Sequence, residues 1–512
     1  MSRALSLALL LTLSAPAFGQ TVDGPGAKQL SDNLARYVGQ AAIEEGILKV
    51  SVDGEVYRIG FDFGALLRKN HSKDPLTFNL APFALLTKPR SDGTWSLSSD
   101  ITPDAFLDVE GPYGVRFSVS GSAFGGIYDP GLAVFTSGAG SMAGMKVISR
   151  DPKEPMDLSI GGGASTLNAS KAAGGGVDLA MTQTIAGFVE TAVVAEGGTG
   201  PKVPVTMKSP KVSVEMTGKG VRTKAFLDLL GFAIANQDEA SLKANQAQLK
   251  SLLTSALPLW ERLEESYRFE GLSFASSMGN FGLAELSATT GIDGISTNGK
   301  IDYRIKAAGL TVPRHLLPSW SAALFPTEVE LIFGGVNLDL DSMANKAIEA
   351  FDLNKNPPLS DEFGKALVAD FMAKSPKIVL RHSTVKNGDI EVAMEGDMTF
   401  PGKKPDTMMT VDVAGYERIV ETFQTAAKSD QQAAQIFPAT LAIKGFAKTL
   451  PDGRLEWVIN VKADGSIIVN GAMLKPANAV QDNPIIDPSD ATVPDNDSGE
   501  NDNGGAGAKL QP

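Results

Sequence analysis

The sequence predicts an α+β protein, with an elongated, predominantly antiparallel β-sheet and several amphipathic helices packed on the sheet. Helical periodicity alternates with runs of period two. Asp-Gly and Asn-Gly pairs stand between alternating runs at 53–54, 387–388 and 464–465, a pattern typical of β-hairpins. This helix-then-hairpin unit recurs about four times at irregular spacing, which argues against a solenoid, whose repeats keep a fixed period.

The first unit begins with "KQLSDNLARYVGQAAIEEG", which places Leu30, Leu34 and Tyr37 on one helical face. Gly46 is expected to end this helix. The run "ILKVSVDGEVYRIGFDF" follows and predicts a hairpin around Asp53-Gly54.

The second half predicts three helical regions and a further hairpin. A helix is expected from about Ala225 to Tyr267, bent at Pro258. Another should begin after the N-cap Ser360, and a hairpin should turn at Asn387-Gly388. The last helix begins near Tyr416, and the final strands are expected to start near Ala439.

Glycine is dense between about 121 and 200, where it is expected to form tight turns between short strands or partly ordered loops. The last patterned stretch, "DGRLEWVINVKADGSIIVNGAML", predicts a hairpin. A two-residue Asp464-Gly465 turn would pair Val461 with Ile468, and Ile467 and Val469 would then lie on the face opposite Trp457.

The chain is expected to divide into four parts. Residues 1–19 have the layout of a secretory signal peptide, with Arg3 before a short apolar run and small residues after it. A β-rich domain with one leading helix is expected over 20–220, a domain of helix-hairpin units over 221–480, and a disordered acidic tail over 481–512. No later segment has the length of a membrane helix, so we predict a soluble protein of the periplasm or a secreted one.

Composition excludes several classes of site. The chain has no Cys, which removes disulfides, thiol nucleophiles and thiolate metal sites. The net charge is −13, and seven of the acids lie after residue 481, so the charge argues against a nucleic-acid partner.

We predict no catalytic, cofactor-binding or metal-binding residues and no cofactor, and therefore a protein that is not an enzyme. The histidines His71, His315 and His382 are too far apart in sequence to indicate a metal site. "GAGSMAG" (138–144) leads into a strand, whereas a nucleotide fingerprint requires a helix. One Ser-x-x-Lys pair, Ser383 with Lys386 and next to His382, supports the alternative of a hydrolase of uncommon type.

Some strands are apolar at positions that belong to both faces, notably "TEVELIFGGVNLDL" (327–340) and "GSIIVNG" (465–471). One interpretation is a strand covered on both sides, with the amphipathic helices on one of them. A second is a concave sheet face, lined by Val, Ile, Leu and Met, that shelters an acyl chain or a lipoprotein lipid. A third is recognition of a peptide or protein partner through an exposed edge.

The signal peptide, the absent Cys, the repeated units and the ending "KADGSIIVNGAML" resemble a family of signal-bearing periplasmic proteins of alphaproteobacteria, known as a domain of unknown function. More distantly, the chain is similar in style to β-rich envelope proteins of the AsmA type, which are associated with lipid transport or outer-membrane homeostasis. We expect no N-terminal membrane anchor of the kind usual there, since the short apolar run is expected to belong to a signal peptide. These resemblances imply a structural or binding role in the cell envelope, with a lipid or another envelope protein as partner, and supply no catalytic residue.

Overall fold

The computed structural model describes residues 21–62, 76–79, 83–100, 104–109, 114–151, 155–195, 202–402 and 404–478. The signal peptide predicted for 1–19, the acidic tail predicted for 481–512 and His71 lie outside these residues.

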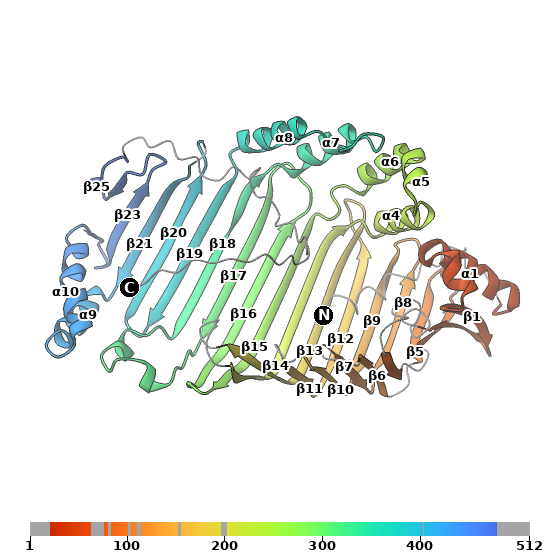
Figure 1. The fold of residues 1–512 in the computed structure, drawn as a ribbon, viewed down its shortest axis with the longest axis horizontal. Coiled ribbons are helices and arrows are strands. Elements are labelled where there is room, and N and C mark those ends of the chain that lie inside the picture. The colour runs from red at the N-terminus through yellow and green to blue at the C-terminus, as the bar shows by residue number, and fades with distance from the viewer. Residues whose placement is uncertain are drawn as a thin grey trace, which may run out of the picture.

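One open antiparallel sheet runs through the described chain (Figure 1). This confirms the prediction of a predominantly antiparallel β-rich fold. The strands pair in this spatial order: β1 (Leu48–Asp53), β2 (Val56–Phe61), β4 (Phe83–Pro89), β5 (Trp95–Asp100), β8 (Ala123–Asp129), β9 (Val134–Met142), β12 (Gly162–Lys171), β13 (Val177–Ala195), β14 (Lys202–Val221), β15 (Arg262–Ser276), β16 (Gly279–Asp293), β17 (Gly299–Ala308), β18 (Glu328–Leu338), β19 (Lys377–Asn387), β20 (Ile390–Thr399), β21 (Asp406–Ala414), β23 (Leu455–Val461), β24 (Ile467–Val469) and β25 (Ala472–Lys475).

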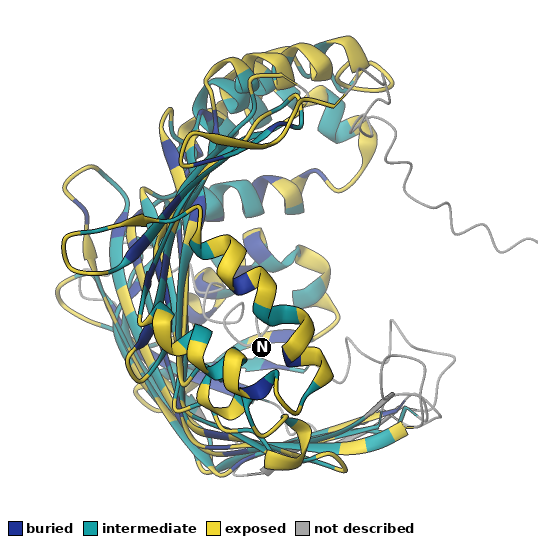
Figure 2. Cartoon of the chain, turned by 90° about the vertical axis from the view of Figure 1, so that its left-hand side faces the viewer, coloured by how far each residue is buried: buried dark blue, intermediate teal, exposed yellow. Residues whose placement is uncertain are grey.

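The sheet divides in two at β13. The first half of this strand pairs with β12, whereas Val189 to Ala192 pair with β11 (Met156–Ile160). From β11 a second branch continues through β10 (Gly144–Ser149), β7 (Val115–Ser120), β6 (Asp104–Val109) and β3 (Leu76–Asn79). Seen from its end, the divided sheet curves into an open trough (Figure 2).

The described helices lie along one long edge of the sheet and at its two ends (Figure 1). Their packing across the sheet face, as the sequence predicted, is therefore not confirmed. The helices are α1 (Gly24–Val38), α2 (Gln40–Glu44), α4 (Thr223–Ala235), α5 (Glu239–Ala244), α6 (Gln246–Ala256), α7 (Leu340–Ala350), α8 (Asp361–Ala373), α9 (Tyr416–Ala426) and α10 (Gln431–Lys444). Within the described residues, no helix is long and apolar enough to cross a membrane.

Two helix predictions are confirmed in detail. Leu30, Leu34 and Tyr37 are buried on one face of α1. Ser360 caps α8, because its side chain accepts a hydrogen bond from the backbone N–H of Phe363 at 3.2 Å.

Two other helix predictions are wrong. The helical region expected to reach Tyr267 ends at Ala256, and β15 begins at Arg262 with an alternating pattern that suits a strand. The final strands do not begin near Ala439, because α10 continues to Lys444 with Pro438 inside it.

The glycine-rich region meets the expectation only in part: Gly175 and Gly176 lie in a turn with positive φ, whereas other glycines lie inside strands. Gly138 lies inside β9, where a Cβ atom would stand 3.3 Å from the ring of Phe124 on β8. At Gly126 an added Cβ would lie 2.7 Å from the carbonyl oxygen of Ser137. Several of these glycines therefore allow neighbouring strands and aromatic rings to approach closely. The sequence interpretation considered glycine only as a turn residue and missed this role.

The register predicted for the last hairpin is wrong by one residue. Val461 pairs with Ile467 and Ile459 pairs with Val469, because the loop holds three residues and the N–H of Lys462 bonds to the carbonyl of Ser466 at 3.0 Å. A shift of one residue moves every side chain to the other face. Val469 is accordingly buried in one core with Trp457 instead of facing away from it.

Buried side chains form three separate clusters. The first joins α1 to β2, β5 and β8 around Leu34, Tyr57 and Trp95. The second lies where the sheet divides, around Ile160, Ile185 and Val212. The third lies at the C-terminal end, where Tyr416 and Ile419 of α9 pack against Trp457. The middle strands lie between the second and third clusters.

Pairing continues across the domain boundary predicted at 220/221, because β14 pairs with β15 along most of its length. The four-part division of the chain stays a prediction.

Candidate functional site

The strands from β15 to β23 place apolar side chains on one face. Directly paired residues of antiparallel strands point to the same side. One row of paired residues is Val214, Tyr267, Ala288, Ile305 and Leu331. A neighbouring row is Met216, Glu265, Thr290, Tyr303, Phe333 and Leu380.

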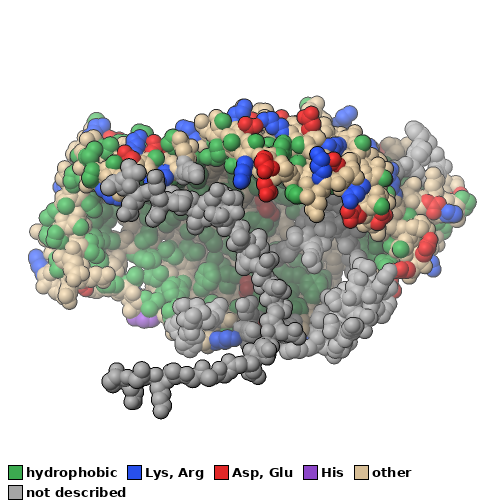
Figure 3. Space-filling model, turned by 45° about the horizontal axis from the view of Figure 1, so that its top comes forward, with side chains coloured by type: hydrophobic (Ala, Val, Ile, Leu, Met, Phe, Trp, Pro, Cys, Tyr) green, Lys and Arg blue, Asp and Glu red, His purple; other side chains and the backbone are tan. Residues whose placement is uncertain are grey.

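We call this side the inner face. The rows continue toward the C-terminal end through Met398, Met409, Ile459 and Val461, which alternation places on the same side. Figure 3 shows hydrophobic side chains lining the hollow of the trough. The inner face therefore lines the concave side of the sheet.

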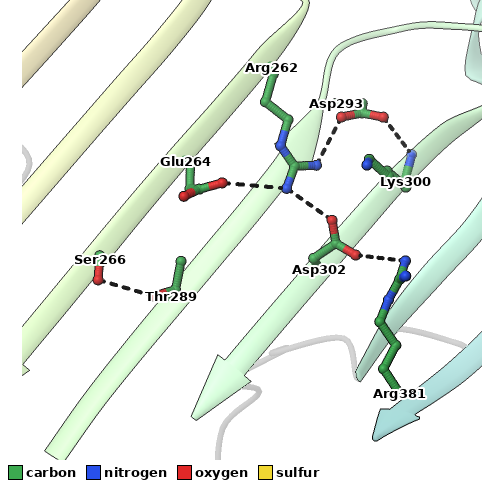
Figure 4. A network of polar contacts seen from close by, with 8 residues as sticks. All are labelled: Arg262, Glu264, Ser266, Thr289, Asp293, Lys300, Asp302 and Arg381. Atoms are coloured by element: carbon green, nitrogen blue, oxygen red, sulfur yellow. Dashed lines mark hydrogen bonds and ion pairs between the residues drawn. The ribbon is translucent and has the colours of Figure 1, made fainter. Parts of the chain in front are cut away.

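The opposite side, the outer face, is polar. It carries cross-strand ion pairs such as Arg268 with Glu285 at 3.6 Å and Arg304 with Glu330 at 3.7 Å. One polar network on this face centres on Arg262 (Figure 4). The Arg262 guanidinium reaches Asp293 and Asp302, each at 2.9 Å.

The Arg262 network joins four strands. Asp302 also pairs with Arg381 of β19 at 3.3 Å (Figure 4). The guanidinium passes over Gly291, where an added Cβ would lie 1.9 Å from Nη2. Burial opposes the charged form of Arg262, but its bonds to Asp293 and Asp302 raise its pKa above the ordinary value. We assign this network to holding the middle strands together.

The middle of the inner face has no described cover. Tyr303 is 36% exposed, Phe333 37%, Ile305 38% and Ile378 49%. The rings of Tyr303 and Phe333 stack with their centroids 5.4 Å apart. Large apolar side chains on a sheet face are ordinarily buried against a second layer. Within the residues that the structure describes, no second layer covers β16 to β19, and the apolar patch is open.

One ionisable pair lies on the inner face. The Tyr267 hydroxyl donates a hydrogen bond to Oε1 of Glu265 at 2.6 Å. The two residues are two positions apart on β15, which places them on the same side. The bond to the carboxylate raises the pKa of Tyr267 to about 12.

The residues that supported a hydrolase do not form a catalytic arrangement. Ser383 is fully buried, and its Oγ accepts from the N–H of Ile332 at 2.9 Å and donates to the carbonyl of Arg381 at 2.8 Å. It fills the irregular position where the β18–β19 register shifts. Lys386 pairs with Glu391 at 2.9 Å, and His382 is exposed.

Buried Ser209 has an equivalent role on β14. Its Oγ lies 2.9 Å from the carbonyl oxygen of Lys211 and 2.8 Å from that of Glu270. Both serines thus supply hydrogen bonds at places where regular strand pairing is interrupted.

Other candidate sites offer less chemistry. No cluster of three or more metal-ligating side chains occurs among the described residues. A cavity of about 210 Å³ lies between α7 and α8. Its buried Asp339 caps α7 through Ser342 and pairs with Lys374 at 3.3 Å, so this carboxylate is already satisfied within the chain.

No family model, no curated protein and no solved structure matches the chain. The resemblance to periplasmic proteins stated from the sequence therefore stays a prediction.

Sequence reasoning found part of this face and missed its centre. The concave apolar face was one of three interpretations of the strand at 327–340, where Leu331 and Phe333 do lie on the inner face. The alternating run "IDYRIKAA" of β17 carries the clearest signal, with Tyr303 and Ile305 inside and Arg304 outside. The alternation of inner and outer side chains on β15 was missed, because a helix was expected to continue through Tyr267.

Proposed function

We propose that the protein binds the acyl chains of lipids along its inner face and has a binding role in the cell envelope. The carrying observation is the apolar patch around Tyr303, Ile305 and Phe333 on the inner face, whose side chains no described second layer covers. Covering an exposed apolar surface is favourable by about 25 cal/mol per Å².

The shape of the site supports an extended ligand. Seven strands from β15 to β21 span about 29 Å at a spacing of about 4.8 Å. An acyl chain could lie across them and contact Tyr303, Phe333 and Leu380, and beyond them Met409 and Ile459 of the same row. A globular partner would require a convex surface of matching curvature.

The periplasmic location is part of this proposal. It is supported by the secretory pattern expected over 1–19 and by the absence of Cys from the sequence. A soluble carrier exposed to envelope lipids would need a concave apolar site and a charged exterior, as the inner and outer faces provide.

The test is uptake of a neutral alkyl ligand by the purified protein. Dodecanol should displace the fluorescent apolar probe N-phenyl-1-naphthylamine, and native mass spectrometry of protein from the periplasm should show bound lipid. Absence of both the displacement and any co-purified lipid would overturn the proposal.

Recognition of another envelope protein is the second candidate. The edge strand β25 is exposed along its whole length, with Met473 at 64% and Leu474 at 48%. An open edge can pair with a strand of a partner. Pull-down of an envelope protein that is lost when Met473 is replaced by Pro would favour this function.

A further inference from the structure

The inner face has one charged position. Glu265 is the only Asp, Glu, Lys or Arg that alternation places on the inner face within the described parts of β15 to β21 and β23. Its paired neighbours on that face are Met216 and Thr290. The site therefore combines a broad apolar surface with a single carboxylate.

Tyr267 holds this carboxylate. Its hydroxyl donates to Oε1 at 2.6 Å, which fixes the carboxylate and leaves Oε2 with no hydrogen bond to the described side chains. Glu265 is half-buried and Tyr267 is 38% exposed, so the pair is accessible from the hollow. A fixed carboxylate beside an apolar surface is suited to an amphiphile whose head group donates hydrogen bonds.

Charge determines which head group fits. No lysine or arginine of these strands lies on the inner face, because alternation places them on the outer one, as with Arg268 and Lys306. A carboxylate or phosphate head near Glu265 would meet like charge, with no lysine or arginine of the described strands on the same face to offset it. An ammonium head would instead form a charge-assisted hydrogen bond.

We infer that the inner face selects amphiphiles with an ammonium head group, and that Glu265, oriented by Tyr267, binds this group while the alkyl chain lies across Tyr303 and Phe333. The inference rests on the proposed binding of acyl chains and adds the head-group class. Glu265 is thus a specificity-determining residue.

The experiment compares three ligands with the same chain, namely dodecylamine, dodecanol and dodecanoate, as competitors of N-phenyl-1-naphthylamine at pH 7. The wild-type protein should bind dodecylamine about tenfold more tightly than dodecanoate, the factor expected for one charge-assisted hydrogen bond. Glu265→Gln should remove this preference, whereas the affinity for dodecanol, whose head group is uncharged, should change by much less than the affinity for dodecylamine.

Glu264→Gln is the matched control, because Glu264 is the adjacent residue and lies on the outer face beside Arg262 at 3.7 Å. It removes the same net charge and should keep the preference for dodecylamine. Tyr267→Phe, which frees the carboxylate but keeps the ring, should reduce the preference without abolishing it.

The outcomes separate the two proposals. If dodecanol binds but the amine and the acid compete equally, or if Glu264→Gln removes the preference as fully as Glu265→Gln, the head-group inference is wrong and acyl-chain binding stands. If none of the three ligands displaces the probe, the head-group inference fails, and if no lipid co-purifies either, acyl-chain binding fails with it.

Discussion

Phe333 offers the sharpest test of an open inner face. The side chain is 37% exposed and stacks on Tyr303 in the centre of the apolar patch. An aromatic side chain can bury about 200 Å², so about 75 Å² of Phe333 remains for a ligand to cover. At about 25 cal/mol per Å², this contact contributes about 2 kcal/mol to binding.

Phe333→Ala should therefore weaken the affinity for dodecanol about 20-fold. The assay is displacement of N-phenyl-1-naphthylamine, performed well below the thermal transition of each variant, so that loss of folded protein does not imitate loss of affinity. Thermal unfolding is measured separately, because the buried part of the ring also contributes to stability.

Met408→Ala is the control. Met408 is 52% exposed, but its paired neighbours Asp397 and Asn460 place it on the outer face. This variant should bind dodecanol as the wild type does. Equal losses in both variants, or unchanged affinity in Phe333→Ala, would show that the ligand does not lie on the inner face.

Three further predictions concern stability. Ser383→Ala leaves the N–H of Ile332 without its partner in a buried position, so the free energy of unfolding should fall by about 1–3 kcal/mol in urea titration, and any hydrolytic activity present in the preparation should not change. Gly291→Ala should displace the guanidinium of Arg262 and lower the melting temperature, whereas Gly453→Ala, at an open turn, should cost less because only its positive φ of 85° is strained. The pKa of Asp412 is raised, mainly by burial and to a smaller extent by the negative charge of Glu456, and its Oδ1 is buried without a hydrogen-bond partner. Because the folded pKa lies above the unfolded one, wild-type stability should fall as pH rises through the interval between them, and Asp412→Asn should be more stable at pH 7 and lose this pH dependence in thermal melts.

The register of the last hairpin shows that local sequence alone can predict the wrong strand pairing. Asp464-Gly465 has the composition of a two-residue turn, but a three-residue loop puts Ile467 and Val469 beside Trp457. The choice between these loops depends on burying the apolar side of the strand against α9, a contact far away in sequence. Local patterns therefore predicted the hairpin and not its faces.

The glycine-rich strands β9 and β12 show a second limit of prediction from local sequence. Glycine at 138 and at 161–163 indicated turns, since glycine is unfavourable inside isolated strands. In the structure, neighbouring strands approach these positions closely, and Phe124 covers Gly138. A pattern within one segment cannot reveal a partner that comes from another segment.

Periodicity, helix caps and turn residues act over a few neighbouring positions, so the sequence was sufficient to predict elements whose signals are local. It determined the antiparallel character of the sheet, the capped start of α8 and the burial of Leu34 on α1. The positions of the helices and the pairing of strands distant in sequence are set by packing between segments and could be seen only in the folded chain. This arrangement leaves Tyr303, Ile305 and Phe333 partly exposed on the inner face, with Glu265 on the same face. The exposure of a side chain on a sheet depends on which elements form a second layer over it, and such elements come from distant parts of the chain.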